Sequence, residues 1–121
     1  MPSRDPVLRL EDILANIELI QEYTRGLSYD EFARDRKSQD AVERCVTRIS
    51  EAASKLEGSV ESIIPDQPWS QIRAVGNVLR HEYDRVNPVF IWRIVSEDLP
   101  PLKVAIKSAL DRLRRKAPDD L

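Results

Sequence analysis

The residues best suited to chemistry lie in one stretch of the chain, Gly76 to Asp84, which contains the only histidine, His81. Arg80 comes directly before this histidine and Tyr83 two positions after it. Histidine changes its charge near neutral pH, and the planar guanidinium of arginine binds phosphate oxygens. The combination predicts proton transfer at a phosphodiester, with an arginine holding the charge of the phosphate.

The polar residues of this stretch share one face if it is helical. Offsets of 0, 4, 7, 8 and 11 relate Arg73, Asn77, Arg80, His81 and Asp84, and such spacings superpose on a helix. A polar stripe is more often simply the solvated face of an amphipathic helix, so the spacing leaves both interpretations open. The ring at position 83 points about 200° away from position 81 on an ideal helix, and it flanks the same cleft only if the helix ends nearby.

Other kinds of active site are poorly supported. One histidine and scattered carboxylates such as Glu51 and Asp84 do not form a metal-ligand motif. A serine triad would need a nucleophile-elbow sequence, and none is present. The single cysteine, Cys45, has apolar neighbours along the chain and is expected in the core rather than as a nucleophile. We therefore expect no metal and no cofactor.

Gly76 is unusual because it falls inside a predicted helix. A glycine in a helix interior costs about 1 kcal/mol relative to alanine. One explanation is the close approach of another backbone, a side chain or a ligand at this point. A local kink, or plain tolerance of the glycine, explains it equally well.

Composition bounds the class of protein. The chain has 121 residues, of which 41% are hydrophobic and 33% charged, with a formal net charge of −2. We expect a single domain over residues 1–121 without a membrane segment, because no apolar run approaches the roughly 18–20 residues that span a bilayer. The single cysteine cannot form an internal disulfide, which fits the expected location in the reducing cytoplasm. A basic segment near the end could contact phosphates, but it is also typical of a solvated helix end; it contains Lys103, Lys107, Arg112, Arg114, Arg115 and Lys116.

The apolar pattern predicts an all-α fold with no sheet. Apolar residues recur at helical spacing from Leu10 to Ile20, and a second helix is expected to begin at a cap at Ser38 or Asp40. A third helix should begin near Trp69, and a short buried helix should follow the turn at Asn87-Pro88. The last helix should begin at Asp98-Leu99-Pro100-Pro101, since proline is tolerated in a first helical turn. These elements predict an up-and-down bundle of about five helices, with a disordered tail at residues 117–121.

The order of these segments resembles the HepT-like (DUF86) branch of the HEPN (higher eukaryotes and prokaryotes nucleotide-binding) domains. The resemblance covers almost the whole chain and rests on several pieces in sequence rather than on one. They are Ile13 to Ile20, Asp40-Ala41-Val42-Glu43-Arg44, Ile49-Ser50-Glu51-Ala52 (like the family's Ile-Gly-Glu-Ala), Pro68-Trp69, His81-Glu82-Tyr83, Trp92 to Val95 and Asp98-Leu99-Pro100.

The resemblance implies a HEPN-like helical toxin of a toxin–antitoxin pair. Such proteins are similar to metal-independent endoribonucleases that act on RNA as homodimers. The implied partner is a minimal nucleotidyltransferase (MNT) antitoxin, which silences the toxin by adenylylating the tyrosine of the motif, here Tyr83. Arg80 and Arg85 would then contact RNA or nucleotide.

The chain departs from the family motif at one position. The motif is an arginine, a polar residue, three further residues, histidine, any residue and tyrosine. His81, Tyr83 and Asn77 match it, but the arginine position is Gly76. Either Arg80 or Arg73 substitutes for the missing guanidinium, with His81 and Asn77 completing the catalytic set, or the chain is an inactive module that still binds a nucleotidyltransferase. A purely structural helical dimer is a third interpretation, but it leaves the histidine and tyrosine unexplained.

Overall fold

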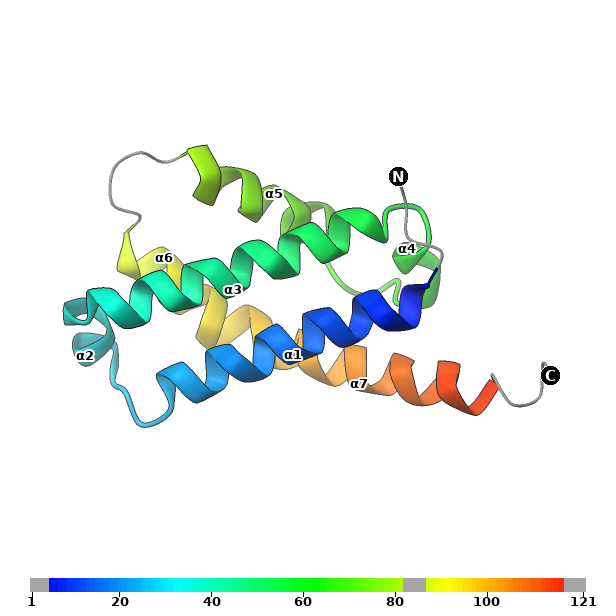
Figure 1. The fold of residues 1–121 in the computed structure, drawn as a ribbon, viewed down its shortest axis with the longest axis horizontal. Helices are drawn as coiled ribbons and strands as arrows, with labels where there is room; N and C mark the ends of the chain where they lie inside the picture. Colours follow the sequence, from blue (N-terminus) through cyan, green and yellow to red (C-terminus); the bar gives the residue numbers. More distant parts are fainter. Residues whose placement is uncertain (1–4, 82–86, 117–121) are drawn as a thin grey trace.

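The computed structural model describes residues 5–81 and 87–116, and these residues form helices and no strand. This confirms the all-α prediction, and the five predicted helices are all present. The structure adds two short helices, α2 and α4, which are not among these five. In chain order the elements are α1 (Pro6–Thr24), α2 (Tyr29–Arg34), α3 (Arg36–Lys55), α4 (Val60–Ile63), α5 (Trp69–His81), α6 (Pro88–Arg93), η1 (Ile94–Asp98) and α7 (Leu99–Lys116) (Figure 1).

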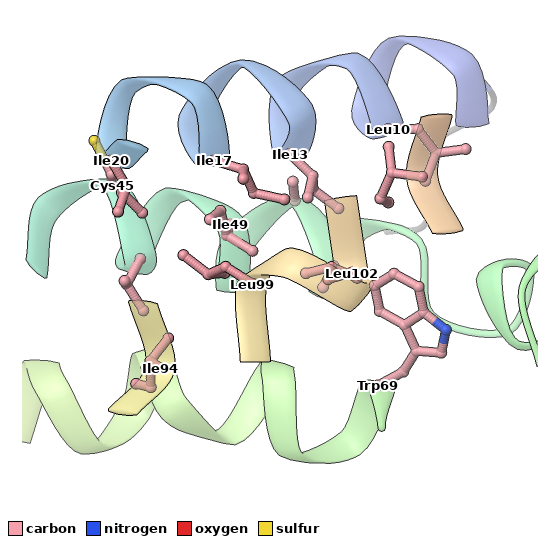
Figure 2. Packing of buried hydrophobic residues seen from close by; sticks show 14 of the residues in the cluster. Leu10, Ile13, Ile17, Ile20, Cys45, Ile49, Trp69, Ile94, Leu99 and Leu102 are labelled. Carbon is pink, nitrogen blue, oxygen red and sulfur yellow. The ribbon is translucent and has the colours of Figure 1, made fainter. Parts of the chain in front are cut away.

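The long helices run alternately up and down. In Figure 1, α3 lies between α1 and α5, and α7 runs along the other side of α1. The predicted apolar face of α1 is fully buried, with Leu10, Ile13, Ile17 and Ile20 pointing toward α3 and α7. Figure 2 shows these side chains above Ile49, Leu99 and Leu102. Burial of these faces, rather than helix propensity, is what holds short helices together.

Local capping sets where α2 and α3 begin. Ser28 and Glu31 form a capping box at the start of α2, in which each side chain accepts a hydrogen bond from the backbone N–H of the other residue. The prediction that Ser38 or Asp40 caps α3 was wrong, because Asp35 is the cap. Its carboxylate accepts hydrogen bonds from the Ser38 backbone N–H (3.2 Å) and hydroxyl (2.6 Å), which leaves Ser38 a donor in the first turn.

The predicted restart near Pro100 is not a break. Residues 88–116 are helical throughout, and α6 passes into α7 through a π-helical turn at Ile94–Asp98. The N–H of Leu99 bonds to the carbonyl of Ile94, five residues earlier. A proline ring crowds the carbonyl four residues before it and supplies no N–H, so a wider turn before Pro100 and Pro101 relieves this conflict.

None of the helices among the described residues is both long and apolar enough to cross a membrane. The predicted core position of Cys45 is confirmed, since its side chain is buried and 2% exposed.

Candidate active site at the end of α5

The predicted site lies on α5, which packs against α3 (Figure 1). The start of this helix is anchored by Trp69, whose ring is buried and whose Nε1–H donates to the carbonyl of Ile64 at 2.8 Å. Its last two described residues are Arg80 and His81, and both are exposed. Unpaired carbonyls at a helix C-terminus favour positive charge, so this end of α5 suits a pair of cationic side chains.

At Gly76, α5 closely approaches α3. The Ser50 hydroxyl of α3 accepts a hydrogen bond from the Gly76 N–H at 3.1 Å and donates one to the carbonyl of Arg73 at 2.7 Å. A Cβ atom at position 76 would lie 2.4 Å from the Ser50 Oγ and 2.7 Å from its Cβ. Of the two explanations that the sequence left open for Gly76, the structure supports the close approach, and the approaching group is Ser50.

Arg80 lies beside the same glycine. Its Nη1 is 3.4 Å from the position that a Cβ of Gly76 would occupy, so the side chain folds back by one turn along α5. Within the described part of the chain, its guanidinium makes no hydrogen bond or ion pair. An exposed arginine with free donors is available to an anionic ligand.

Arg73 is differently placed. Its guanidinium forms a two-pronged ion pair with Glu61 of α4 (2.6 and 3.1 Å), and its Nε–H donates to the carbonyl of Ala53 at 3.0 Å. The hydrogen bond from Arg73 lowers the pKa of Glu61 to about 2, and the same bond raises the pKa of Arg73. The Arg73 side chain is only 14% exposed and is bound between α3, α4 and α5, about two turns from Arg80.

Of the remaining predicted site residues, Asn77 is exposed and lies one turn before His81 on the same face of α5. Tyr83 and Arg85 lie outside the described residues, as does the predicted disordered tail at 117–121. In the described ranges, no cluster of three or more histidine, cysteine or carboxylate side chains is arranged to hold a metal ion.

The basic segment of α7 is partly engaged within the fold. Arg112 donates to the carbonyl of Ile63 at 3.0 Å, Arg114 pairs with Glu11 of α1, and Lys103 donates to Gln21 at 2.7 Å. The structure thus gives several of these side chains structural roles, which favours the interpretation of a solvated helix end.

An apolar groove of about 480 Å³ runs between α5 and the segment from α6 to α7. Val78 (45% exposed) and Phe90 (37% exposed) lie on opposite walls, and Ile72 and Val75 contribute to the α5 side. Arg93, Glu97 and Asp98 form a charged edge. This groove begins within one turn of Arg80 along α5, since Val78 lines it.

Sequence reasoning missed two residues of this region, Ser50 and Glu61. Ser50 falls among the small and apolar residues that form the buried face of α3, and Gly76 is the small residue on the facing helix. A small polar residue opposite a mid-helix glycine is a signal that could have found the contact. No local signal indicates Glu61, because α4 is a single turn whose position depends on tertiary packing.

Comparison with known proteins gives a consistent picture. A family model described as Ribonuclease HepT-like matches residues 13–109. The protein named "Probable ribonuclease HepT" of Thermococcus cleftensis is 37% identical over 94 residues, covering 78% of this chain and 86% of its own. The protein named "Putative RNase MJ1380" of Methanocaldococcus jannaschii is 30% identical over 107 residues, covering 88% and 98%. No solved structure matches the chain significantly.

The matched region, residues 13–109, spans most of the chain and includes all the described residues of α5. It contains Ser50, Gly76, Arg80 and His81. The chain belongs to the ribonuclease HepT-like family.

Proposed function

We propose that this protein is a metal-independent endoribonuclease that acts as the toxin of a toxin–antitoxin pair. The observation that carries the proposal is the end of α5, where Arg80 and His81 are adjacent and exposed. The Arg80 guanidinium lies beside Gly76, with Nη1 3.4 Å from the position of a Cβ there, and has no partner among the described residues. The names of the two relatives, both given as ribonucleases, support RNA as the substrate.

Arg80 is the better substitute for the motif arginine. The guanidinium of Arg73 already binds Glu61 and Ala53, so its use at a phosphate would break three hydrogen bonds. Arg80 would break none with the described residues. Its five N–H donors suit the developing charge on two phosphate oxygens.

In the proposed reaction the ribose 2′-oxygen attacks the adjacent phosphorus and the bond from phosphorus to the 5′-oxygen breaks. His81 accepts the proton of the 2′-hydroxyl, and a protonated imidazole gives a proton to the departing 5′-oxygen. Arg80 stabilises the charge on the non-bridging oxygens, and Asn77 orients the phosphate or the imidazole by hydrogen bonding. The products are a 2′,3′-cyclic phosphate and a 5′-hydroxyl.

The chemistry gives a reason for a homodimer. A single chain has one histidine, whereas the reaction uses one base and one acid. We assign the apolar groove between α5 and α6 to a second copy, because a two-fold interface brings the same patch of both copies together. The groove carries Arg93 beside Glu97 and Asp98, so its charged edge can pair with that of an identical groove.

Regulation by a nucleotidyltransferase antitoxin is the second part of the proposal. Adenylylation of Tyr83 would add bulk and negative charge two residues from His81 and so keep the RNA phosphate away. The support for it is the family to which the chain belongs and the presence of tyrosine at this position. Intact-mass spectrometry after co-expression with a neighbouring nucleotidyltransferase tests it, and an unmodified Tyr83 would contradict it.

A non-catalytic module that binds the nucleotidyltransferase is the alternative, and Gly76 favours it because glycine cannot bind a phosphate as arginine does. Incubation of the purified protein with RNA, with and without EDTA, separates the two. The proposal predicts metal-independent cleavage that yields 2′,3′-cyclic phosphate ends and is lost in His81→Ala. Uncut RNA, or equal cutting by His81→Ala, would favour the alternative.

A further inference from the structure

Ser50 has no role in the family motif or in the reaction proposed above, yet it is one of two buried polar side chains among the described residues. It is 2% exposed. Its single hydroxyl bridges two backbone groups of α5, the carbonyl of Arg73 and the N–H of Gly76. Both groups lie in the interior of a helix, where backbone N–H and carbonyl groups already form hydrogen bonds with each other. The bridge is therefore not needed to supply them with partners, and it fixes how α5 lies on α3.

The hydrogen bonds of Ser50 lie close to the side chain of Arg80. Gly76 and Arg80 are four residues apart and occupy one face of α5. The Ser50 Oγ would lie 2.4 Å from a Cβ at position 76, and Arg80 Nη1 would lie 3.4 Å from the same point. The hydroxyl and the guanidinium thus both lie close to the point that a Cβ of Gly76 would occupy, so the backbone turn that Ser50 holds is the one beside which the Arg80 side chain lies.

The rest of α5 is held by other contacts. Arg73 ties its first half to α3 and α4 through Ala53 and Glu61, and Trp69 anchors its start. Ile72, Val75 and Leu79 pack against the core. Loss of the Ser50 hydroxyl should consequently leave the helix in place while loosening the turn that carries Arg80.

We propose that Ser50 is a positioning residue for this site, and that its hydroxyl holds the α5 backbone at Gly76 so that Arg80 is aimed at the scissile phosphate. The inference rests on the proposed ribonuclease function. Small displacements of a catalytic group are costly, since a misplacement of about 1 Å can reduce a rate by about 10²-fold. Ser50 should thus act mainly on the rate of the chemical step, with a smaller effect on the affinity for RNA.

The test uses the full chain in four forms: wild type, Ser50→Ala, Arg80→Ala and the double variant. We expect Ser50→Ala to lower the single-turnover cleavage rate by about 10- to 100-fold with little change in KM, in line with a misaligned group. The double variant should be barely slower than Arg80→Ala alone, because a serine that acts through Arg80 has nothing left to position. A merely structural serine would give independent, multiplicative losses.

Ser54→Ala is the matched control. Ser54 lies one turn further along α3, and its hydroxyl donates to the Ser50 carbonyl at 3.1 Å within the same helix. The Ser54→Ala variant should cleave RNA at the wild-type rate. Thermal melts of all variants separate lost folding from lost alignment. Wild-type rates in a folded Ser50→Ala, or multiplicative losses in the double variant, would overturn the inference while leaving the ribonuclease function intact.

Failure of the ribonuclease function is recognised separately. If wild type cuts no RNA, the same four forms are titrated with a single-stranded RNA that is 2′-O-methylated throughout and cannot be cleaved by this route. A positioned Arg80 then predicts that Arg80→Ala weakens binding, that Ser50→Ala weakens it by a smaller factor, and that the double variant binds as Arg80→Ala does. Additive losses, or binding that does not depend on Arg80, would overturn the positioning role as well.

Discussion

At the scale of single residues, the proposed site takes its guanidinium from a position one turn later than the expected motif. Gly76 removes the side chain from the motif position, and the Arg80 side chain folds back beside it. A guanidinium that starts one turn later along the helix thus lies close to the place where the motif side chain would begin. The exchange is possible because both positions share one face of α5.

Arg80→Ala should lower RNA cleavage by about 10²- to 10³-fold, as expected for the loss of one donor that stabilises transition-state charge. Arg80→Lys should fall between this variant and wild type, because lysine keeps the charge but loses the planar fork. Rates from single-turnover assays check both. Arg36→Ala, which removes an exposed arginine paired with Asp40 at the start of α3, serves as the control. Equal rates for Arg80→Ala and Arg36→Ala would contradict the assignment.

At the scale of helices, α5 is fixed at two points of different chemistry. Near its start, the Arg73–Glu61 pair joins it to α4, and one turn later Ser50 joins it to α3. The ion pair is partly exposed, since the Glu61 side chain is 47% exposed, so salt and pH should weaken it. The Ser50 bridge is buried and carries no charge, so neither should affect it.

The Glu61–Arg73 pair predicts a defined acid sensitivity. The pKa of Glu61 in the folded protein is about 2, below its ordinary value of 4.5. Because the pKa is lower in the folded protein, the ion pair stabilises the folded state fully above about pH 4.5, and this stabilisation is lost as the pH falls toward about 2. Wild type should therefore be more stable than Glu61→Gln at neutral pH, and the difference should shrink across this range.

Urea unfolding at a series of pH values measures that difference. Arg73→Gln is the control, since removal of the partner should abolish the same pH-dependent share of the free energy of unfolding. The double variant should then lose little more than either single variant. A gap between wild type and Glu61→Gln that stays constant from pH 5 to about 2 would show that the pair does not act in this way.

The sequence pattern was sufficient to predict the long helices, but not the single turn α4, the continuous passage from α6 into α7, or the contacts between helices. Helical spacing gave the buried face of α1, and the proline and asparagine signals gave the start of α6. The cap of α3 was misplaced because Asp35 and Ser38 are both good capping residues. The stripe from Arg73 to His81 was correctly placed on one helix, but spacing could not show that Glu61 binds Arg73. That contact joins residues twelve positions apart through tertiary packing.

At the scale of the whole molecule, the bundle leaves one apolar surface uncovered by its described residues. The core buries the inner faces of α1, α3 and α7 (Figure 2). The groove between α5 and α6 leaves Val78 and Phe90 partly exposed. Exposed apolar residues gathered in a groove are typical of an interaction surface. We expect this surface to hold the second copy.

Val78→Asp should convert the dimer to a monomer, because the new carboxylate would be buried without a partner in the interface. Val104→Asp is the matched control, since Val104 is 69% exposed on α7 and does not line the groove. Sedimentation velocity measures the oligomeric state. Two variants that sediment alike would show that the groove is not the interface.

The core itself should respond as a well-packed interior. Ile17 is fully buried between α1 and its neighbours, and Ile17→Ala should cost about 2–5 kcal/mol of unfolding free energy, as large-to-small core changes do. Val104→Ala on the surface should change it by less than about 0.5 kcal/mol. Equilibrium unfolding in urea compares the two. Similar midpoints would contradict the described core.

The contact between Ser50 and Gly76 also determines the order in which substitutions at these two positions can be accepted. Any residue that brings a Cβ to position 76 meets the Ser50 side chain at 2.4 Å, so it is blocked until position 50 has become smaller. Ser50→Gly removes both of the obstructing atoms and is the permissive first step. A return of arginine to position 76 is thus contingent on an earlier change in another helix, and the reverse order passes through a variant that packs poorly.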